Sequence, residues 1–184
     1  MTAAEVIQII ESGTQQYFHG LIQEMRSNLG TSHYRRLSND ELARRMTVIY
    51  RNLEHWLTAR DEAAVRSAGE DLGKRRFEEG IPLGQVVLAL ILEEKYLRKY
   101  CGDQGVPLDE EWSQVVSDYF QKMTYHTGRG YEAALEQSNR LAYRAAPADA
   151  GATPAGKPLA RKQVPQPEND SEISRGGEIG EVAG

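Results

Sequence analysis

Histidine, cysteine and glutamate are the side chains of this sequence best suited to chemistry, because they bind metals and transfer protons. The chain of 184 residues holds one cysteine, Cys101, and four histidines, His19, His33, His55 and His126. No two histidines are four positions apart, and no glutamate lies three residues before a histidine, so the His-x-x-x-His and Glu-x-x-His motifs are both missing. We therefore expect no metal site.

Nucleophilic and phosphate chemistry have no recognisable motif either. The Gly-x-Ser-x-Gly turn of serine hydrolases is missing, and so are the glycine-rich loops that hold nucleotide phosphates. Cys101 comes directly before Gly102 at an expected helix end, which is typical of a packing residue. No catalytic residue can be named, and we expect that the protein is not an enzyme.

Haem binding stays open as an alternative, because one axial histidine on a helix makes few demands on the surrounding sequence. His55 lies beside Trp56, and His126 follows Tyr125, each within a stretch expected to be helical. An unpaired histidine on a helix is more often structural than a ligand. We expect no cofactor, and we keep His55 and His126 as the two candidates for a haem ligand.

A block of mixed charge allows two interpretations. Lys74–Arg76 is followed, after Phe77, by Glu78–Glu79 near an expected helix end. In the first interpretation these side chains form a solvated face, with charge pairs one helical turn apart. In the second, one of the two arginines is a buried partner for Glu93 or Glu94 across the following turn. The first is favoured, because most surface charge pairs mark no site.

Helical periodicity dominates the first 146 residues and must position any site. Apolar residues between positions 6 and 29 fall near one stripe, which predicts a long first helix that bends near Gly13. Ser38 and Glu41 form a Ser-x-x-Glu capping box, in which each side chain bonds a free backbone N–H, and a strong apolar stripe follows. A third helix is expected from about Asp61 to Glu79.

Two similar turns separate the later helices. Gly80-Ile81-Pro82-Leu83 recurs as Gly105-Val106-Pro107-Leu108, and in each the glycine ends one helix and the proline prepares the next. The apolar run Val86–Leu92 between them is too short to span a bilayer and too apolar to read DNA bases. We expect this run to be buried on all sides. A last helix should extend from near Leu108 to about Tyr143.

Composition and charge separate two regions. Residues 147–184 contain five of the seven prolines, six glycines and no aromatic residue, so we expect a disordered tail after an ordered domain of residues 1–146. The formal net charge of −5 argues against nucleic-acid binding. The N-terminus has no basic, apolar leader, and a lone cysteine suits a reducing compartment. We expect a cytoplasmic protein without a membrane segment.

One block of sequence resembles a known family. Leu37-Ser38-x-x-Glu41-Leu42, followed by Leu72-Gly73-Lys74-Arg75-Arg76-Phe77-Glu78-Glu79-Gly80-Ile81-Pro82-Leu83 and an apolar helix, is similar to the N-terminal domain of RsbR-type co-antagonists of the RsbT kinase. The resemblance covers about residues 15–140. It implies a globin-like all-α sensor domain, here of about five or six helices, that usually lacks haem and dimerises.

The resemblance also implies a role in signalling. In RsbR-type proteins this domain precedes a STAS domain and takes part in stressosome-type control of an alternative sigma factor. No STAS domain follows Tyr143 in this sequence, so the phosphorylatable serine and threonine residues of that domain are missing. Direct antagonism of RsbT through STAS is therefore not expected.

These observations lead to one main functional hypothesis. We expect a non-enzymatic, homodimeric sensory or protein-interaction module of bacterial signal transduction and stress response, with a kinase or a STAS-type regulator as a further partner. The alternative is a globin-like sensor that binds haem or another small ligand. We expect the two copies of the dimer to meet through the apolar face of the last helix, which carries Trp112, Val116, Tyr119, Phe120 and Met123.

Overall fold

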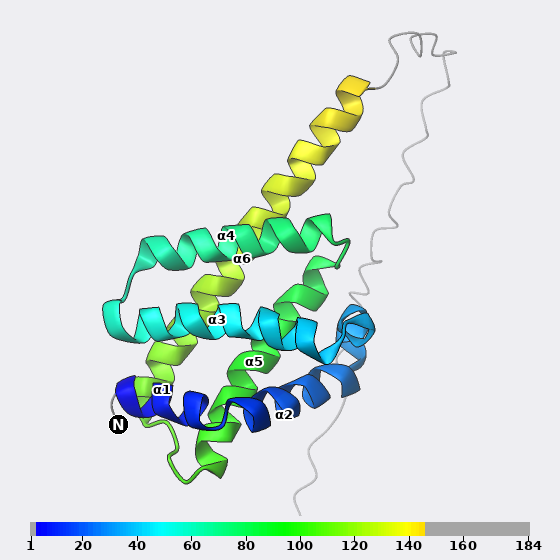
Figure 1. Ribbon diagram of the computed structural model, residues 1–184. Coiled ribbons are helices and arrows are strands. Elements are labelled where there is room, and N and C mark those ends of the chain that lie inside the picture. Colours follow the sequence, from blue (N-terminus) through cyan, green and yellow to red (C-terminus); the bar gives the residue numbers. More distant parts are fainter. Residues whose placement is uncertain (1–2, 146–184) are drawn as a thin grey trace, which may run out of the picture. The chain divides into compact units, whose positions relative to one another are not determined.

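Helices make up the fold. The computed structural model describes residues 3–145, and they form six α-helices and one 3-10 helix, with no β-strand among them (Figure 1). The elements are α1 (Ala3–Ser12), α2 (Thr14–Ser27), η1 (Leu29–Arg36), α3 (Asn39–Ala59), α4 (Glu62–Glu78), α5 (Leu83–Asp103) and α6 (Glu110–Ala145). The prediction of an all-α bundle is confirmed. The predicted tail, residues 147–184, lies outside the described residues.

Most helix ends lie where local chemistry predicts them. Gly13 separates α1 from α2, and the Ser38 hydroxyl accepts a hydrogen bond from the Glu41 backbone N–H at 3.2 Å. Gly80 has φ of 69°, in the left-handed region that favours glycine. The capping box is only half formed, because the carboxylate of Glu41 pairs with arginines of its own helix instead of returning to Ser38.

The start of α4 gives a first testable prediction. One carboxylate oxygen of Asp61 accepts hydrogen bonds from the backbone N–H groups of Ala63 and Ala64, at 2.9 and 3.0 Å. Asp61→Ala should lower the free energy of unfolding by about 1 kcal/mol, because two N–H groups lose their cap. Urea unfolding at neutral pH measures this loss. The control is Asp71→Ala in the exposed middle of α4, and an equal loss there would contradict the capping role.

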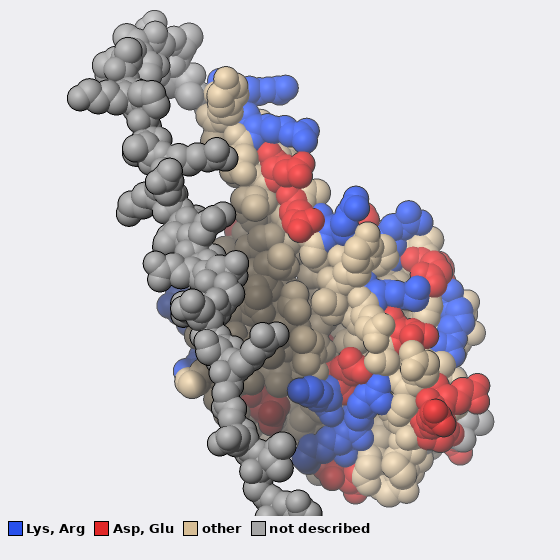
Figure 2. All heavy atoms as spheres, turned by 180° about the vertical axis from the view of Figure 1, so that it is seen from behind, with Lys and Arg blue, Asp and Glu red and all other residues tan. Residues whose placement is uncertain are grey.

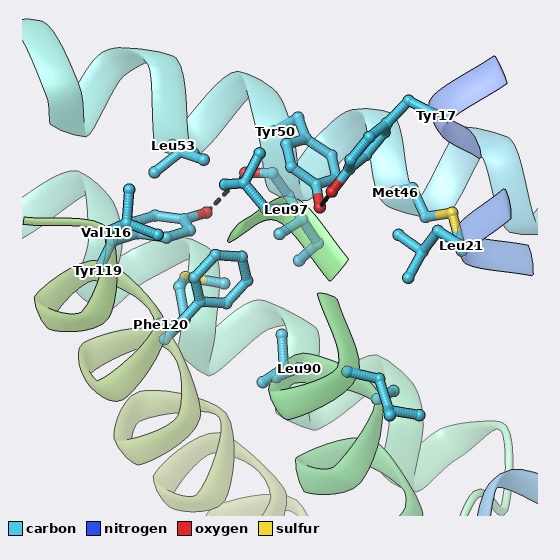
Figure 3. Close-up of a cluster of buried hydrophobic side chains, with 14 of the residues drawn as sticks. Tyr17, Leu21, Met46, Tyr50, Leu53, Leu90, Leu97, Val116, Tyr119 and Phe120 are labelled. Atoms are coloured by element: carbon cyan, nitrogen blue, oxygen red, sulfur yellow. Dashed lines mark hydrogen bonds between the residues drawn. The ribbon is translucent and has the colours of Figure 1, made fainter. Parts of the chain in front are cut away.

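The core lies between two groups of helices. Figure 1 shows α3 and α4 running side by side in opposite directions, with α5 and α6 crossing behind them and α1 and α2 along one side. Side chains from α2, α3, α5 and α6 meet in the centre (Figure 3). Among them Tyr17, Leu53, Leu97, Tyr119 and Phe120 are almost fully buried. The bundle thus buries aromatic residues from both ends of the described chain.

Helix α5 carries the apolar run Val86–Leu92, and its expected burial on all sides is wrong. Ile91 is 39% exposed, and Val87 and Leu88 are only partly buried. A helix inside a small bundle has neighbours on one side and solvent on the other, so even a continuous apolar run leaves one face outward. No helix between residues 3 and 145 has the length and apolarity needed to cross a membrane.

Helices α4 and α6 cross at close range through glycine. A Cβ atom at Gly73 would overlap the carbonyl oxygen of Thr127, and one at Gly130 would overlap the backbone of Glu70. Gly69 faces His126 in the same way. Because the two backbones touch, the crossing fixes where α6 lies on α4. Beyond it α6 leaves the bundle, as Figure 1 shows.

Candidate functional site

A small cavity in the middle of the bundle is the candidate site. It measures about 20 Å³ and is lined by side chains from α2, η1, α3, α4 and α5. Most of the lining is aliphatic or methionine, and the exceptions are Tyr34, Arg45, Arg76 and Glu93. About 10–15 Å³ is enough for one water molecule, so the cavity has room for a water but not for an organic ligand.

Glu93 is the unusual residue of this cavity. It is only 6% exposed, and its Oε2 atom is buried without a hydrogen-bond partner. Its position follows from the helix, because Val86, Leu90, Glu93 and Leu97 succeed one another at steps of four, three and four residues on the inner face of α5. Burial disfavours the charged carboxylate and raises the pKa of Glu93 to about 8, against the lowering effect of the Arg76 charge.

Arg76 lies on the other side of the cavity, near the end of α4. It is 7% exposed, and together with Glu93 it makes up the charged residues that are buried in the described part of the chain. Its Nη1 atom donates to the Oε2 atom of Glu79 at 2.9 Å. The guanidinium therefore lines the cavity and also pairs with a carboxylate nearer the surface.

A network of ion pairs surrounds this arginine. Arg45 on α3 donates from Nη1 to Glu79 at 2.8 Å and from Nε to Glu41 at 2.6 Å. The exposed Arg44 also pairs with Glu41, so three arginines and two carboxylates are joined where α3 meets the end of α4. The ion pairs of these arginines go to Glu41 and Glu79, and none of them goes to Glu93.

Tyrosine hydroxyls form the rest of the polar surroundings. Burial raises the pKa of Tyr34 to about 12, and it raises the pKa values of Tyr17, Tyr50 and Tyr119 as well. The hydroxyls of Tyr17 and Tyr50 bond each other, and that of Tyr119 donates to the Ile49 carbonyl at 2.6 Å (Figure 3). These groups stay neutral at ordinary pH.

The two interpretations of the charged block are each correct in part. Arg76 is the buried arginine, and Glu93 rather than Glu94 is the carboxylate that shares its cavity. The hydrogen bonds of Arg76, however, go to Glu79, as the surface interpretation expects. Glu94 faces another way and accepts from Arg98 at 2.9 Å. The position of Glu93 on the apolar stripe is the sequence signal that indicates its burial.

The two haem candidates do not fit a haem site. The side chain of His55 is 52% exposed, and its ring nitrogen lies 3.4 Å from a carboxylate oxygen of Asp61. His126 packs against Gly69 at the crossing of α4 and α6. Neither histidine lines the central cavity, which is far smaller than the roughly 300 Å³ of a typical small-molecule site. Within residues 3–145, no cluster of three potential ligands could hold a metal ion.

The expected dimer contact is corrected by the structure. Val116, Tyr119, Phe120 and Met123 are at most 2% exposed, because they fill the core of their own chain. Only Trp112 keeps a partly exposed surface. The apolar spacing on the first half of α6 marks the inner face of the bundle. These residues cannot meet a second copy without opening the fold.

A different part of α6 is available to a partner. From Glu132 to Arg144 the side chains other than Ala134 are exposed, including Leu135, Leu141 and Tyr143. A groove of about 330 Å³ between α5 and the middle of α6 is lined in part by the exposed residues Ile91 and Tyr125. Figure 2 shows an uncharged area on this side of the bundle, with charged side chains mainly to its right and below it.

No family model matches the chain, and neither a curated protein nor a solved structure is significantly similar to it. The functional interpretation therefore rests on the geometry of the cavity and of α6.

Proposed function

We propose that this protein is a non-enzymatic sensory and protein-interaction module of bacterial signalling, which acts as a homodimer and passes changes in its bundle to a partner along α6. The continuity of α6 is the observation that carries the proposal. One half of this helix supplies core residues such as Tyr119 and Phe120, and the other half extends into solvent. A change in core packing around the first half of α6 can therefore move the second half, because both belong to one continuous helix.

One face of α6, which includes the exposed Leu135, supports pairing with a second copy. Thr124, Gly128 and Leu135 lie at steps of four and seven residues, so they share one face of the helix. This face runs from the groove between α5 and α6 onto the projecting half of α6. Leu135 and the exposed groove residues Ile91 and Tyr125 give this side of the bundle apolar area that is typical of protein interfaces, and a two-fold symmetric dimer is the commonest soluble oligomer.

The resemblance to RsbR-type domains supports the signalling role. Its characteristic block, residues 72–83, forms the end of α4, the turn and the start of α5, and it includes Arg76 beside the central cavity. The proposed downstream partner is a kinase or a STAS-type regulator, as in that family. No observation favours the haem-binding alternative.

Light scattering of the full chain tests the homodimer. Leu135→Arg places a charge on the proposed contact face and should weaken dimerisation at least about tenfold, since a buried unpaired charge is costly. Gln137→Arg is the matched control, because it adds the same charge to the opposite face of α6. The wild type and the control should have twice the mass of one chain. A wild type that stays monomeric, or equal effects of the two variants, would contradict the proposed interface.

A further inference from the structure

Arg76 lies between two carboxylates. Glu79 is nearer the surface, and Glu93 is buried inside the bundle. In the structure its guanidinium pairs with Glu79 and also lines the cavity into which Glu93 points. Oε2 of Glu93 has no hydrogen-bond partner. We propose that Glu93 is a proton-binding site, and that the presence of its proton decides whether Arg76 pairs with Glu79 or with Glu93.

The charges around the cavity are the reason that Arg76 exchanges Glu79 for Glu93 when Glu93 loses its proton. With Glu93 protonated, Arg45 and Arg76 pair with Glu41 and Glu79, and the exposed Arg44 pairs with Glu41 from the solvent side, which is the arrangement observed. When Glu93 releases its proton to water, the cavity gains a negative charge with no counter-charge in contact. Isolated buried charges are strongly unfavourable, whereas a buried pair with good hydrogen bonds is tolerated. Arg76 is the cation that already lines the cavity from α4, and Arg45 keeps both outer carboxylates.

No other titratable group that faces Glu93 gains or loses a proton near neutral pH. Burial raises the pKa of Glu93 to about 8. The charged groups nearby are Arg45 on α3 and Arg76 on α4, and the other titratable groups that face Glu93 are tyrosines of α2, η1, α3 and α6, namely Tyr17, Tyr34, Tyr50 and Tyr119. The pKa values of these tyrosines are raised above their ordinary value, so their hydroxyls remain protonated where Glu93 titrates.

A change in the partner of Arg76 is coupled to α6 through the backbone contact between α4 and α6. Arg76 lies three residues after Gly73, whose backbone packs directly on that of Thr127 in α6. A shift at the end of α4 is therefore transmitted at a contact that has no flexible side chain to absorb it. The proton-binding site itself does not depend on the proposed signalling function, because it concerns only groups inside one bundle.

Carbon NMR of the full chain with labelled glutamate carboxyls tests the proposal. One carboxyl signal should titrate well above pH 6 and be missing in Glu93→Gln, which assigns it. In Glu79→Gln, Arg76 has no competing carboxylate, so the pKa of Glu93 should fall by about one unit or more. Glu94→Gln is the matched control, being adjacent on α5 but bonded to Arg98, and should leave the pKa of Glu93 unchanged.

A second measurement does not require a substitution. The side-chain Nε–H signal of Arg76 in the wild type should shift with the same midpoint as the Glu93 carboxyl, because one proton controls both groups. The proposal is overturned if Glu93 titrates below pH 5, if its pKa is equal in wild type and Glu79→Gln, or if the Arg76 signal does not follow it. Dimerisation is measured separately, so failure of the dimer leaves this result standing.

Discussion

Glu93→Gln is expected to stabilise the protein at pH 9 by about 3–5 kcal/mol while changing its stability little at pH 5. The pKa of Glu93 in the folded protein is about 8, whereas the unfolded chain releases this proton near the ordinary glutamate pKa of 4.5. Between pH 4.5 and pH 8 the folded state binds more protons than the unfolded chain. The free energy of unfolding of the wild type therefore falls as pH rises, by about 1.4 kcal/mol per pH unit. The amide has no proton to lose and no charge to bury.

Urea unfolding followed by circular dichroism between pH 5 and pH 9 measures this effect. The stability of the wild type should be highest at the acid end of this range, decline towards about pH 8 and level off above it. Glu94→Gln serves as control, because Glu94 is half-buried beside Arg98 and its removal should leave the pH dependence of the wild type in place. Parallel curves for wild type and Glu93→Gln would show that Glu93 is not a buried acid.

Two glycines of α6 are expected to respond to the same substitution with opposite signs. Gly130→Ala should lower the free energy of unfolding by about 2–3 kcal/mol, because its Cβ would overlap the backbone of Glu70 and force α4 and α6 apart. Gly128→Ala should raise it by up to about 1 kcal/mol, since no atom outside its own turn lies within 4 Å and alanine favours the helix. Thermal and urea unfolding measure both variants.

This pair separates helix propensity from packing, because the two sites differ by only two positions on one helix. Gly73→Ala on α4 should behave like Gly130→Ala, as its Cβ would overlap the Thr127 carbonyl. If all three substitutions stabilise the protein, the close crossing of α4 and α6 is wrong. If the expected signs are found, the crossing is the fixed point from which α6 leaves the bundle.

Local signals account for most of the helix ends. Ser38 and Asp61 cap their helices with their own side chains, and Gly80 takes a backbone conformation that glycine adopts at little cost. Such interactions join residues a few positions apart, so a sequence displays both partners together. The 3-10 helix η1 was missed, because it depends on the Asn28 cap and on a bond from Thr31 to Met25, and neither has a strong periodic pattern.

The sequence by itself determined that the part of the chain described by the structure, residues 3–145, is all-α, where most of its α-helices begin and end, and that α6 has an apolar face. Only the tertiary structure decided what that face meets, since a stripe such as Tyr119 and Phe120 has the same spacing whether it packs inside its own bundle or against a second copy. It also decided that Arg76 pairs with Glu79 while Glu93 stays without a partner. The physical reason is that burial and charge pairing depend on which helices lie side by side, and the contacts that settle this join residues far apart in the chain.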